Sequence, residues 1–175
     1  MAHVNQIRWC FEIRNKFPEM FEGKQVLDVG SLDINGNNRY LFISCNYTGL
    51  DIGHGNNVDI ICPIEDYVTD KKYDTIISTE MLEHCRNWDK ALLKMYDLLV
   101  DGGLLLITAG GDGRYPHGIT GYQPEGSPYT NDYYGNISNE MISSILTPSM
   151  FVECFYRQHI GNDMQFYGIK KNKHD

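Results

Sequence analysis

The chain has 175 residues, the length of one domain with a full hydrophobic core, and leaves no room for a second domain. Its formal net charge is -8, which excludes a protein that holds a long stretch of nucleic-acid backbone, because phosphates are bound by clustered lysines and arginines. Five widely spaced cysteines with no C-x-x-C pair predict buried thiols in a reducing compartment.

The first 17 residues carry four charged side chains, so they contain neither the apolar run of a signal peptide nor that of a membrane span. We therefore expect a soluble, cytoplasmic protein with no membrane partner, present as a monomer or a homodimer. A helix is predicted over residues 3–17, because Val4, Ile7 and Phe11 recur at helical spacing before Pro18. Within residues 1–22 this helix is expected to cover one face of a sheet.

Short apolar runs alternate with helical patterns along the next part of the chain. The runs predict strands at 25–29, 47–50, 58–61, 74–78 and 103–108. The patterns between them predict helices at 36–44, 63–69 and 88–99, the last stopped by Asp101-Gly102-Gly103. Such alternation specifies a parallel sheet with helices on both faces.

Residues 109–137 are rich in Gly, Pro, Tyr and Asn and show no sustained period. A loop this long in a compact domain is usually functional or disordered, and this one follows the fifth strand, at the edge where open parallel sheets bind ligands. We interpret it as a substrate-facing lid. Asn136 or Ser138 then caps a helix that runs through Leu146, and residues 151–156 and 165–170 predict two antiparallel strands.

The predicted fold is thus a single α/β domain over residues 1–175. It is Rossmann-like and doubly wound, with a mostly parallel seven-stranded sheet and an antiparallel C-terminal strand.

Two strand ends carry the residues of a nucleoside-cofactor site. Val26-Leu27-Asp28-Val29 runs into Gly30, where backbone amides can approach a ligand, and the next strand ends at Asp51, whose carboxylate can accept hydrogen bonds from a ribose diol. Each residue has a simpler alternative: Asp51 as a turn residue that caps Gly53, and Gly30 as a relief of backbone strain. Asp28 is expected to orient the glycine loop rather than to contact the ligand.

Two further blocks extend this pattern. The strand at 73–78 runs into Thr79-Glu80-Met81-Leu82-Glu83-His84, and Leu99-Val100-Asp101-Gly102-Gly103 leads into another apolar run. In this order the four blocks resemble the class I S-adenosylmethionine-dependent methyltransferases, in particular the methyltransferase type 11 group. The resemblance extends from about Val26 to Ile169. The chain departs from it in the glycine loop 30–36, which lacks the second and third glycines of G-x-G-x-G, and at Pro63, which stands where the family often carries an acidic residue.

The resemblance implies S-adenosylmethionine as the cofactor, bound across the carboxyl ends of the strands. It implies contacts of the methionine tail with Gly30 and Ser31, of the ribose with Asp51, of the adenine with Ile64 and Glu65, and of the amino group with Thr79. Further cofactor contacts are expected from Leu32, Ile52 and Glu80. The implied reaction is methyl transfer to an oxygen or nitrogen of a small molecule or an exposed terminal group.

Methyl transfer from a sulfonium needs alignment above all, and it needs a proton acceptor when the nucleophile is a hydroxyl. His117, flanked by Pro116 and Gly118 in the lid, is the first candidate for this base. His84 is the second, with an orienting or helix-capping role beside the cofactor as its alternative. The lid tyrosines are further candidates, for which packing roles are the simpler interpretation: Tyr115, Tyr122, Tyr129, Tyr133 and Tyr134.

Glu80, Glu83 and His84 form E-x-x-E-H, which at helical spacing places the three side chains on one face. Two carboxylates and an imidazole can hold a divalent cation, and Mg²⁺ is expected over zinc because two of the three ligands are oxygen donors. Similar blocks bind metal in ubiquinone-pathway O-methyltransferases and small-RNA 2'-O-methyltransferases, whereas many relatives carry nearly the same letters without a metal. The further histidine of the RNA enzymes has no counterpart near Asn136, so His117 or Asp132 would have to replace it.

Two other functions compete with methyl transfer. A nicotinamide-dependent oxidoreductase shares the strand, glycine and ribose-acid pattern, but the chain lacks G-x-G-x-x-G and has no room for a separate catalytic domain. A catalytically inert relative that binds only the cofactor or a partner is consistent with the altered glycine loop.

Overall fold

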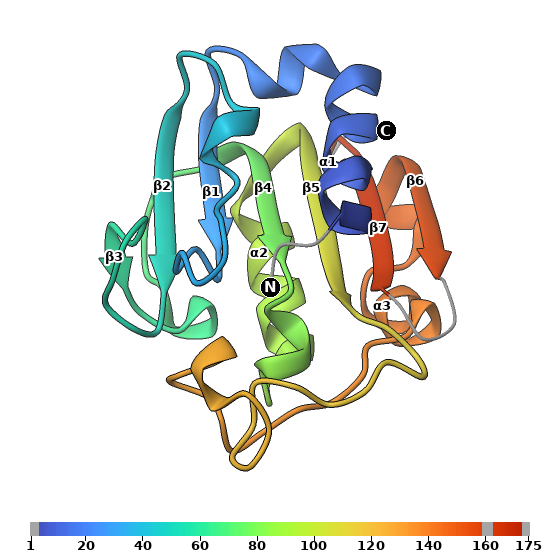
Figure 1. Cartoon of the computed structure of the whole chain (residues 1–175). Coiled ribbons are helices and arrows are strands. Elements are labelled where there is room, and N and C mark those ends of the chain that lie inside the picture. Colours follow the sequence, from blue (N-terminus) through green and yellow to red (C-terminus); the bar gives the residue numbers. More distant parts are fainter. Residues whose placement is uncertain (1–3, 159–162, 173–175) are drawn as a thin grey trace.

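The computed structural model describes residues 4–158 and 163–172, in which seven strands form one sheet of order β3-β2-β1-β4-β5-β7-β6 (Figure 1). The strands are β1 (Gln25–Val29), β2 (Asn46–Asp51), β3 (Ile60–Ile61), β4 (Tyr73–Thr79), β5 (Leu99–Gly110), β6 (Phe151–Gln158) and β7 (Asp163–Lys170). All neighbouring pairs are parallel except those of β7, which runs antiparallel to both β5 and β6. The predicted mostly parallel, seven-stranded sheet with an antiparallel C-terminal strand is confirmed.

The strand order reverses direction between β1 and β4. The chain runs outward from β1 through β2 to β3, then crosses back to β4 on the other side of β1. In an open parallel sheet this point leaves a crevice outside the carboxyl ends of the two strands. Because Asp28 pairs with Gly49 on one side and Ile77 on the other, the ends of β1, β2 and β4 lie at the same edge.

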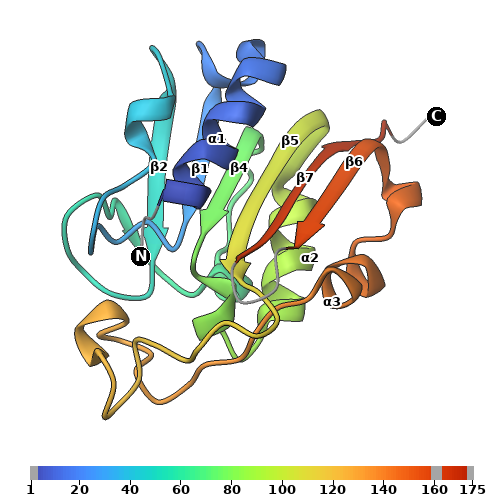
Figure 2. The same ribbon diagram turned by 45° about the vertical axis from the view of Figure 1, so that its right-hand side comes forward.

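In the described part of the chain three α-helices cover the two faces of the sheet: α1 (Val4–Lys16), α2 (Trp88–Leu98) and α3 (Asn139–Ile145). Figure 2 shows α1 on one side and α2 and α3 on the other. The predicted first helix is confirmed, and its Trp9, Cys10 and Ile13 pack in one core with Leu104, Leu106 and Tyr167 of the sheet. The α3 helix begins where the Ser138 hydroxyl accepts a hydrogen bond from the Met141 amide, so Ser138 is the cap.

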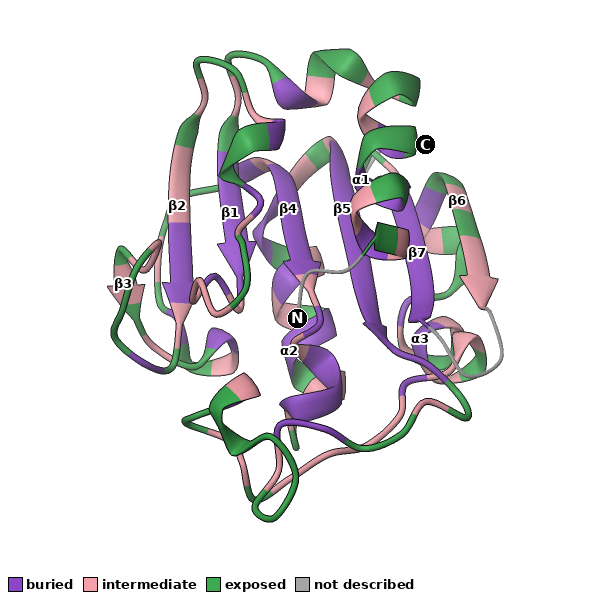
Figure 3. Ribbon diagram, in the orientation of Figure 1, coloured by how far each residue is buried: buried purple, intermediate pink, exposed green. Residues whose placement is uncertain are grey.

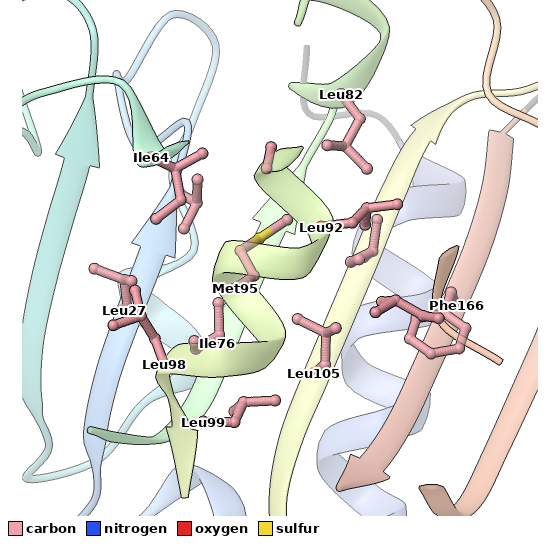
Figure 4. Packing of buried hydrophobic residues seen from close by; sticks show 14 of the residues in the cluster. Leu27, Ile64, Ile76, Leu82, Leu92, Met95, Leu98, Leu99, Leu105 and Phe166 are labelled. Atoms are coloured by element: carbon pink, nitrogen blue, oxygen red, sulfur yellow. The ribbon is translucent and has the colours of Figure 1, made fainter. Parts of the chain in front are cut away.

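The larger core lies under α2. Its buried residues Ala91, Leu92, Met95 and Leu98 share one face of the helix, as their spacing predicts. They meet apolar side chains of the central strands, among them Leu27, Ile76 and Leu105 (Figure 4). The central strands are buried along most of their length (Figure 3).

Two predicted helices, at 36–44 and 63–69, are wrong. Only single 3₁₀ turns occur there, at Arg39–Leu41 and Ile64–Asp66. In the first segment the Asp33 carboxylate accepts hydrogen bonds from the Gly36 amide and the Asn37 side chain, which favours a loop over a helix. The second turn ends at Tyr67, whose backbone is already extended.

The predicted helix at 88–99 is confirmed as α2, but Asp101-Gly102-Gly103 do not stop it. The helix ends at Leu98 and β5 begins at once, so the strand is longer than the predicted 103–108. Gly102, with a φ of 75°, lies where the pairing of β5 with β4 shifts register between Tyr73 and Thr75. Gly102 therefore allows the backbone conformation of an irregularity inside β5 and does not end the helix.

The five cysteines are all free thiols, but only Cys10 is buried, so the prediction of five buried thiols is correct for one of them. None of the described helices is long and apolar enough to cross a bilayer.

Candidate active site

A cavity of about 680 Å³ lies at the carboxyl ends of β1, β2 and β4. Its lining includes every residue that the sequence predicted for the cofactor: Gly30, Ser31, Leu32, Asp51, Ile52, Ile64, Glu65, Thr79 and Glu80. His84 lines it as well, whereas His117 and Glu83 are not among its lining residues. The lid closes the other side with residues 126–130, 132 and 133 and passes below the strand ends in Figure 1.

Asp51 is held at the cavity by two backbone amides. Its Oδ1 accepts a hydrogen bond from the Gly53 N–H at 2.9 Å, and its Oδ2 accepts one from the Leu32 N–H at 3.1 Å. The capping role considered from the sequence is therefore real, but each oxygen keeps acceptor capacity. Burial raises the pKa of Asp51, and the amide hydrogen bonds oppose this rise.

The loop after β1 is fixed by hydrogen bonds to β2 and by the backbone conformation of Gly30. The amides of Gly30 and Ser31 both donate to the Leu50 carbonyl, at 2.9 and 3.1 Å, so both donors are engaged within the protein. Gly30 has a φ of 80°, and a Cβ there would lie 2.5 Å from Cγ of Met81. This position requires glycine because of its backbone conformation and the close approach of the Met81 side chain.

Asn38 connects the ends of β1 and β4 and was missed by the sequence analysis. Its Nδ2 donates to Asp28 Oδ1 at 3.3 Å and to Thr79 Oγ1 at 3.0 Å, while the Tyr47 hydroxyl donates to the other Asp28 oxygen. Burial raises the pKa of Asp28 to about 6. The sequence signal was the carboxylate itself, since a buried Asp in a strand needs hydrogen-bond donors from elsewhere.

The segment 80–84 is not the helix that the E-x-x-E-H spacing suggested. Glu80 has a positive φ of 55°, and only Leu82–His84 form a 3₁₀ turn. The Glu80 carboxylate accepts hydrogen bonds from Thr108 Oγ1 at 2.9 Å and from Arg114 Nη1 at 2.8 Å. Arg114 also pairs with Asp163 of β7, so this lid arginine lies between two buried carboxylates.

The far part of the lid packs on the end of β2 and on Arg86. The Tyr129 hydroxyl donates to the His54 carbonyl at 3.1 Å, and its ring occupies the space where a Gly53 Cβ would stand, 2.0 Å away. Arg86 donates to Asp132 at 3.0 Å and lies over the Tyr133 ring. These contacts attach this part of the lid to the end of β2 and to Arg86.

Behind the cavity wall, Glu83, His84 and His117 form a compact buried group. Each offers one ligand atom, and these atoms lie within 4.8 Å of one another. Burial raises the pKa of Glu83 to about 8 and lowers that of His84 to about 4, and burial also lowers the pKa of His117. Of the two residues named as replacements for the missing histidine, His117 joins the pair, whereas Asp132 is bound to Arg86.

The remaining candidate bases divide by position. Tyr134 packs edge-on against both imidazoles, with ring centroids 5.4 Å from His84 and 5.0 Å from His117. Tyr129 and Tyr133 line the cavity, while Tyr115 and Tyr122 are largely exposed. Only His84, Tyr129 and Tyr133 of the predicted proton acceptors therefore face the cavity.

Together, the doubly wound sheet and the cavity at its switch point define a Rossmann-like α/β protein with a ligand site at the strand ends. A family model described as a methyltransferase domain matches residues 1–123. The chain belongs to this methyltransferase domain family, which confirms the resemblance found in the sequence. No curated protein matches the chain.

Solved structures share the fold at low identity. Phosphoethanolamine N-methyltransferase 2 of Haemonchus contortus superposes with a TM-score of 0.67 at 17% identity, over 94% of this chain and 53% of that one. The N-methyltransferase NodS of Bradyrhizobium japonicum gives a TM-score of 0.62 at 15% identity, over 95% and 87%. The 1,6-didemethyltoxoflavin-N1-methyltransferase of Burkholderia thailandensis gives 0.63 at 15%, over 95% and 79%. The chain thus spans about half the length of the Haemonchus enzyme.

Proposed function

We propose that the chain transfers a methyl group from S-adenosylmethionine to an oxygen or nitrogen of a small molecule or an exposed terminal group. The observation that carries the proposal is the cavity, because it unites the ends of three strands with Asp51 fixed at its wall. Membership of the methyltransferase domain family supports the reaction. The Haemonchus and Bradyrhizobium structures, both solved with S-adenosylhomocysteine, support the cofactor.

In this proposal Asp51 accepts the ribose hydroxyls with the lone pairs that Leu32 and Gly53 leave open. Ile52, Ile64 and Glu65 flank the adenine. The methionine end extends past the loop at 30–32 toward Thr79 and Glu80, on the other side of β1. Asn38 would hold the two sides in register, because it bonds to both Asp28 and Thr79.

When bound, the cofactor supplies a methyl group on a sulfonium, which the acceptor lone pair takes as the S–C bond electrons pass to sulfur. The protein must therefore align the acceptor and receive any proton it loses. His84 is the residue we assign to this second task, because it lines the cavity and its lowered pKa keeps the imidazole neutral. His117 lies behind it and is assigned to positioning.

The acceptor half of the cavity favours a small molecule. Its walls are largely aromatic and apolar, from Tyr40 on one side and Pro128, Tyr129 and Tyr133 of the lid on the other. The formal net charge of -8 also disfavours a polyanion as the acceptor.

One observation favours a second candidate, cofactor binding without turnover. The Gly30 and Ser31 amides are satisfied by Leu50, so the loop has fewer donors for a ligand than the G-x-G-x-G pattern provides. A nicotinamide-dependent oxidoreductase gains no support, since it needs those same amides for a pyrophosphate.

Calorimetric titration with S-adenosylhomocysteine and, separately, with NAD⁺ tests the proposal. We expect binding of the first and none of the second. Incubation with S-adenosylmethionine and a panel of small amines, alcohols and phenols, followed by detection of S-adenosylhomocysteine, then measures turnover. Binding of NAD⁺ alone would overturn the proposed function, and cofactor binding without product from any acceptor class would select the second candidate.

A further inference from the structure

The buried group behind the cavity wall consists of Glu83, His84, His117 and Tyr134, and the proposed methyl transfer gives Glu83 and Tyr134 no role. The turn after β4 supplies Glu83 and His84, and the lid supplies the other two. The side chains meet next to the end of β5, where a Cβ on Gly110 would lie 2.4 Å from the Tyr134 hydroxyl and 3.4 Å from Glu83 Oε1. In both ribbon views the lid passes beside this turn (Figures 1 and 2).

Each imidazole is oriented by a backbone group through one nitrogen only. His117 Nδ1 lies 3.2 Å from the Tyr115 carbonyl, to which it donates, and the His84 ring is hydrogen-bonded to the Tyr133 backbone. The other nitrogens, His117 Nε2 and His84 Nδ1, are buried and have no hydrogen-bond partner among the described residues. Metal-ligating histidines have this arrangement, since a backbone acceptor fixes the tautomer and leaves a lone pair for the ion.

Glu83 is the third residue of the group with open acceptor atoms. Glu83 is 0% exposed, and neither carboxylate oxygen has a hydrogen-bond partner of normal geometry among the described residues. The backbone amides of Glu83 and Gly110 act on this carboxylate only by opposing the rise of its pKa. A buried carboxylate is normally hydrogen-bonded, paired with a cation or bound to a metal. Here one carboxylate and two imidazoles, all buried, present open acceptor atoms within 4.8 Å of one another.

Glu80 lies outside this group, which changes the metal expected. Its two oxygens are engaged by Thr108 and Arg114, so the predicted set of two carboxylates and one imidazole does not form. A set with two nitrogen donors and one oxygen donor suits zinc or another late first-row dication better than Mg²⁺, which prefers oxygen ligands and bound waters.

We propose that Glu83, His84 and His117 form a binding site for a zinc-like divalent cation, with the Tyr134 hydroxyl closing its fourth side. His84 also lines the cavity, so the ion would enter from there. Because Glu83 and His84 belong to the turn after β4 and His117 belongs to the lid, the ion would join these two segments. The site shares His84 and His117 with the proposed methyl transfer, and with the ion bound His84 would serve as a ligand and no longer as the proton acceptor.

The test uses the full chain, stripped of metal by chelator dialysis and without S-adenosylmethionine. We expect Zn²⁺ to bind with a stoichiometry of one in calorimetry and to raise the melting temperature, while Mg²⁺ does neither. Co²⁺ should give visible d–d absorption bands typical of a low-coordinate site with nitrogen and oxygen ligands. Glu83→Gln and His117→Gln should each weaken Zn²⁺ binding by more than about 10-fold.

Matched variants separate the buried site from other zinc ligands. His54→Gln, at a histidine outside the group, and Glu80→Gln should both keep the affinity for Zn²⁺. Glu83→Gln removes a buried charge without a hydrogen-bond partner, so its metal-free form should melt at or above the wild-type temperature. His117→Gln also loses the bond to the Tyr115 carbonyl, so a cooperative melting transition of its metal-free form is the check that it folds. Equal zinc affinity in wild type and both ligand variants, absence of zinc binding, or an equal loss in Glu80→Gln would each overturn the proposal.

Discussion

The Leu32 amide donates a hydrogen bond of 3.1 Å to the Asp51 carboxylate, which joins the loop after β1 to the end of β2. The same carboxylate accepts from Gly53 at 2.9 Å. Asp51 thus shapes the cavity from two sides in addition to presenting acceptors to it. A change at this residue should therefore act on the cavity wall and on the ligand together.

Replacing Asp51 with Ala is expected to weaken S-adenosylhomocysteine binding by about 1 to 3 kcal/mol, as when hydrogen bonds to a charged group are lost. Calorimetry measures the affinity, and thermal melting of the free protein measures the separate effect on the loop. Asp70→Ala, which removes an exposed carboxylate elsewhere, is the control. Unchanged affinity in Asp51→Ala would remove the ribose assignment.

The sequence predicts those parts of the fold that depend on local periodicity. The face formed by Leu92 and Met95 specifies α2, and short apolar runs specify β1 and β4. The segment 36–44 has helix-forming spacing, but the Asp33 carboxylate overrides it by accepting hydrogen bonds from the Gly36 amide and the Asn37 side chain.

The residues of the candidate site were likewise predictable only where they depend on local sequence. Gly30 and Asp51 could be found because Gly30 directly follows β1 and Asp51 is the last residue of β2. Arg114 could not, since its partners Glu80 and Asp163 lie 34 and 49 residues away in the chain. The spacing of Glu83 and His84 suggested a ligand pair, but whether Glu80 or His117 joins them depends on the positive φ at Glu80.

Arg114 lies between two carboxylates whose side chains are 1% exposed, Glu80 and Asp163. Arg114→Ala should lower the free energy of unfolding by about 2 to 4 kcal/mol, because it leaves two buried carboxylates without their shared cation. Arg114→Lys should recover part of this loss, since it restores the charge without the planar fork. Urea unfolding measures both.

The control for this experiment is Arg86→Ala, which breaks the exposed pair with Asp132 in the same lid. Exposed pairs contribute little, so this variant should unfold close to the wild type. Similar losses of unfolding free energy in Arg114→Ala and Arg86→Ala would show that the buried ion pairs stabilise the fold no more than the exposed pair does.

Asp28 should make stability depend on pH. Its pKa is raised from the ordinary 3.8 to about 6 by burial, so the folded state holds the proton more tightly than the unfolded state does. The resulting stabilisation is complete below pH 3.8 and is lost as the pH rises through about 6. We expect this group to lower the free energy of unfolding by about 1 to 3 kcal/mol over that range.

Urea unfolding between pH 4 and 7 of wild type and Asp28→Asn checks this expectation. The variant cannot titrate at this position, so the difference in stability between the two proteins should change with pH in the stated direction. Asp70→Asn, which also removes one negative charge, should run parallel to wild type. A difference between wild type and Asp28→Asn that is constant with pH would contradict the raised pKa.

The contact between Gly53 and Tyr129 decides how the lid meets the end of β2. A Cβ on residue 53 would lie 2.0 Å from two ring carbons of Tyr129, and the φ of Gly53 is outside the left-handed range, so the ring alone excludes a side chain. Gly53→Ala should therefore displace Tyr129, break its bonds to His54, weaken S-adenosylhomocysteine binding and speed proteolysis within residues 119–131. In a Tyr129→Ala background the same substitution should have no further effect, which corresponds to a coupling energy of about 1 kcal/mol in a double-mutant cycle.

Gly126→Ala is the control, because its Cβ would meet Gly118 Cα at an ordinary 3.6 Å. If the effects of the Gly53 and Tyr129 substitutions on S-adenosylhomocysteine affinity were additive, the Tyr129 ring would not contact Gly53 in solution.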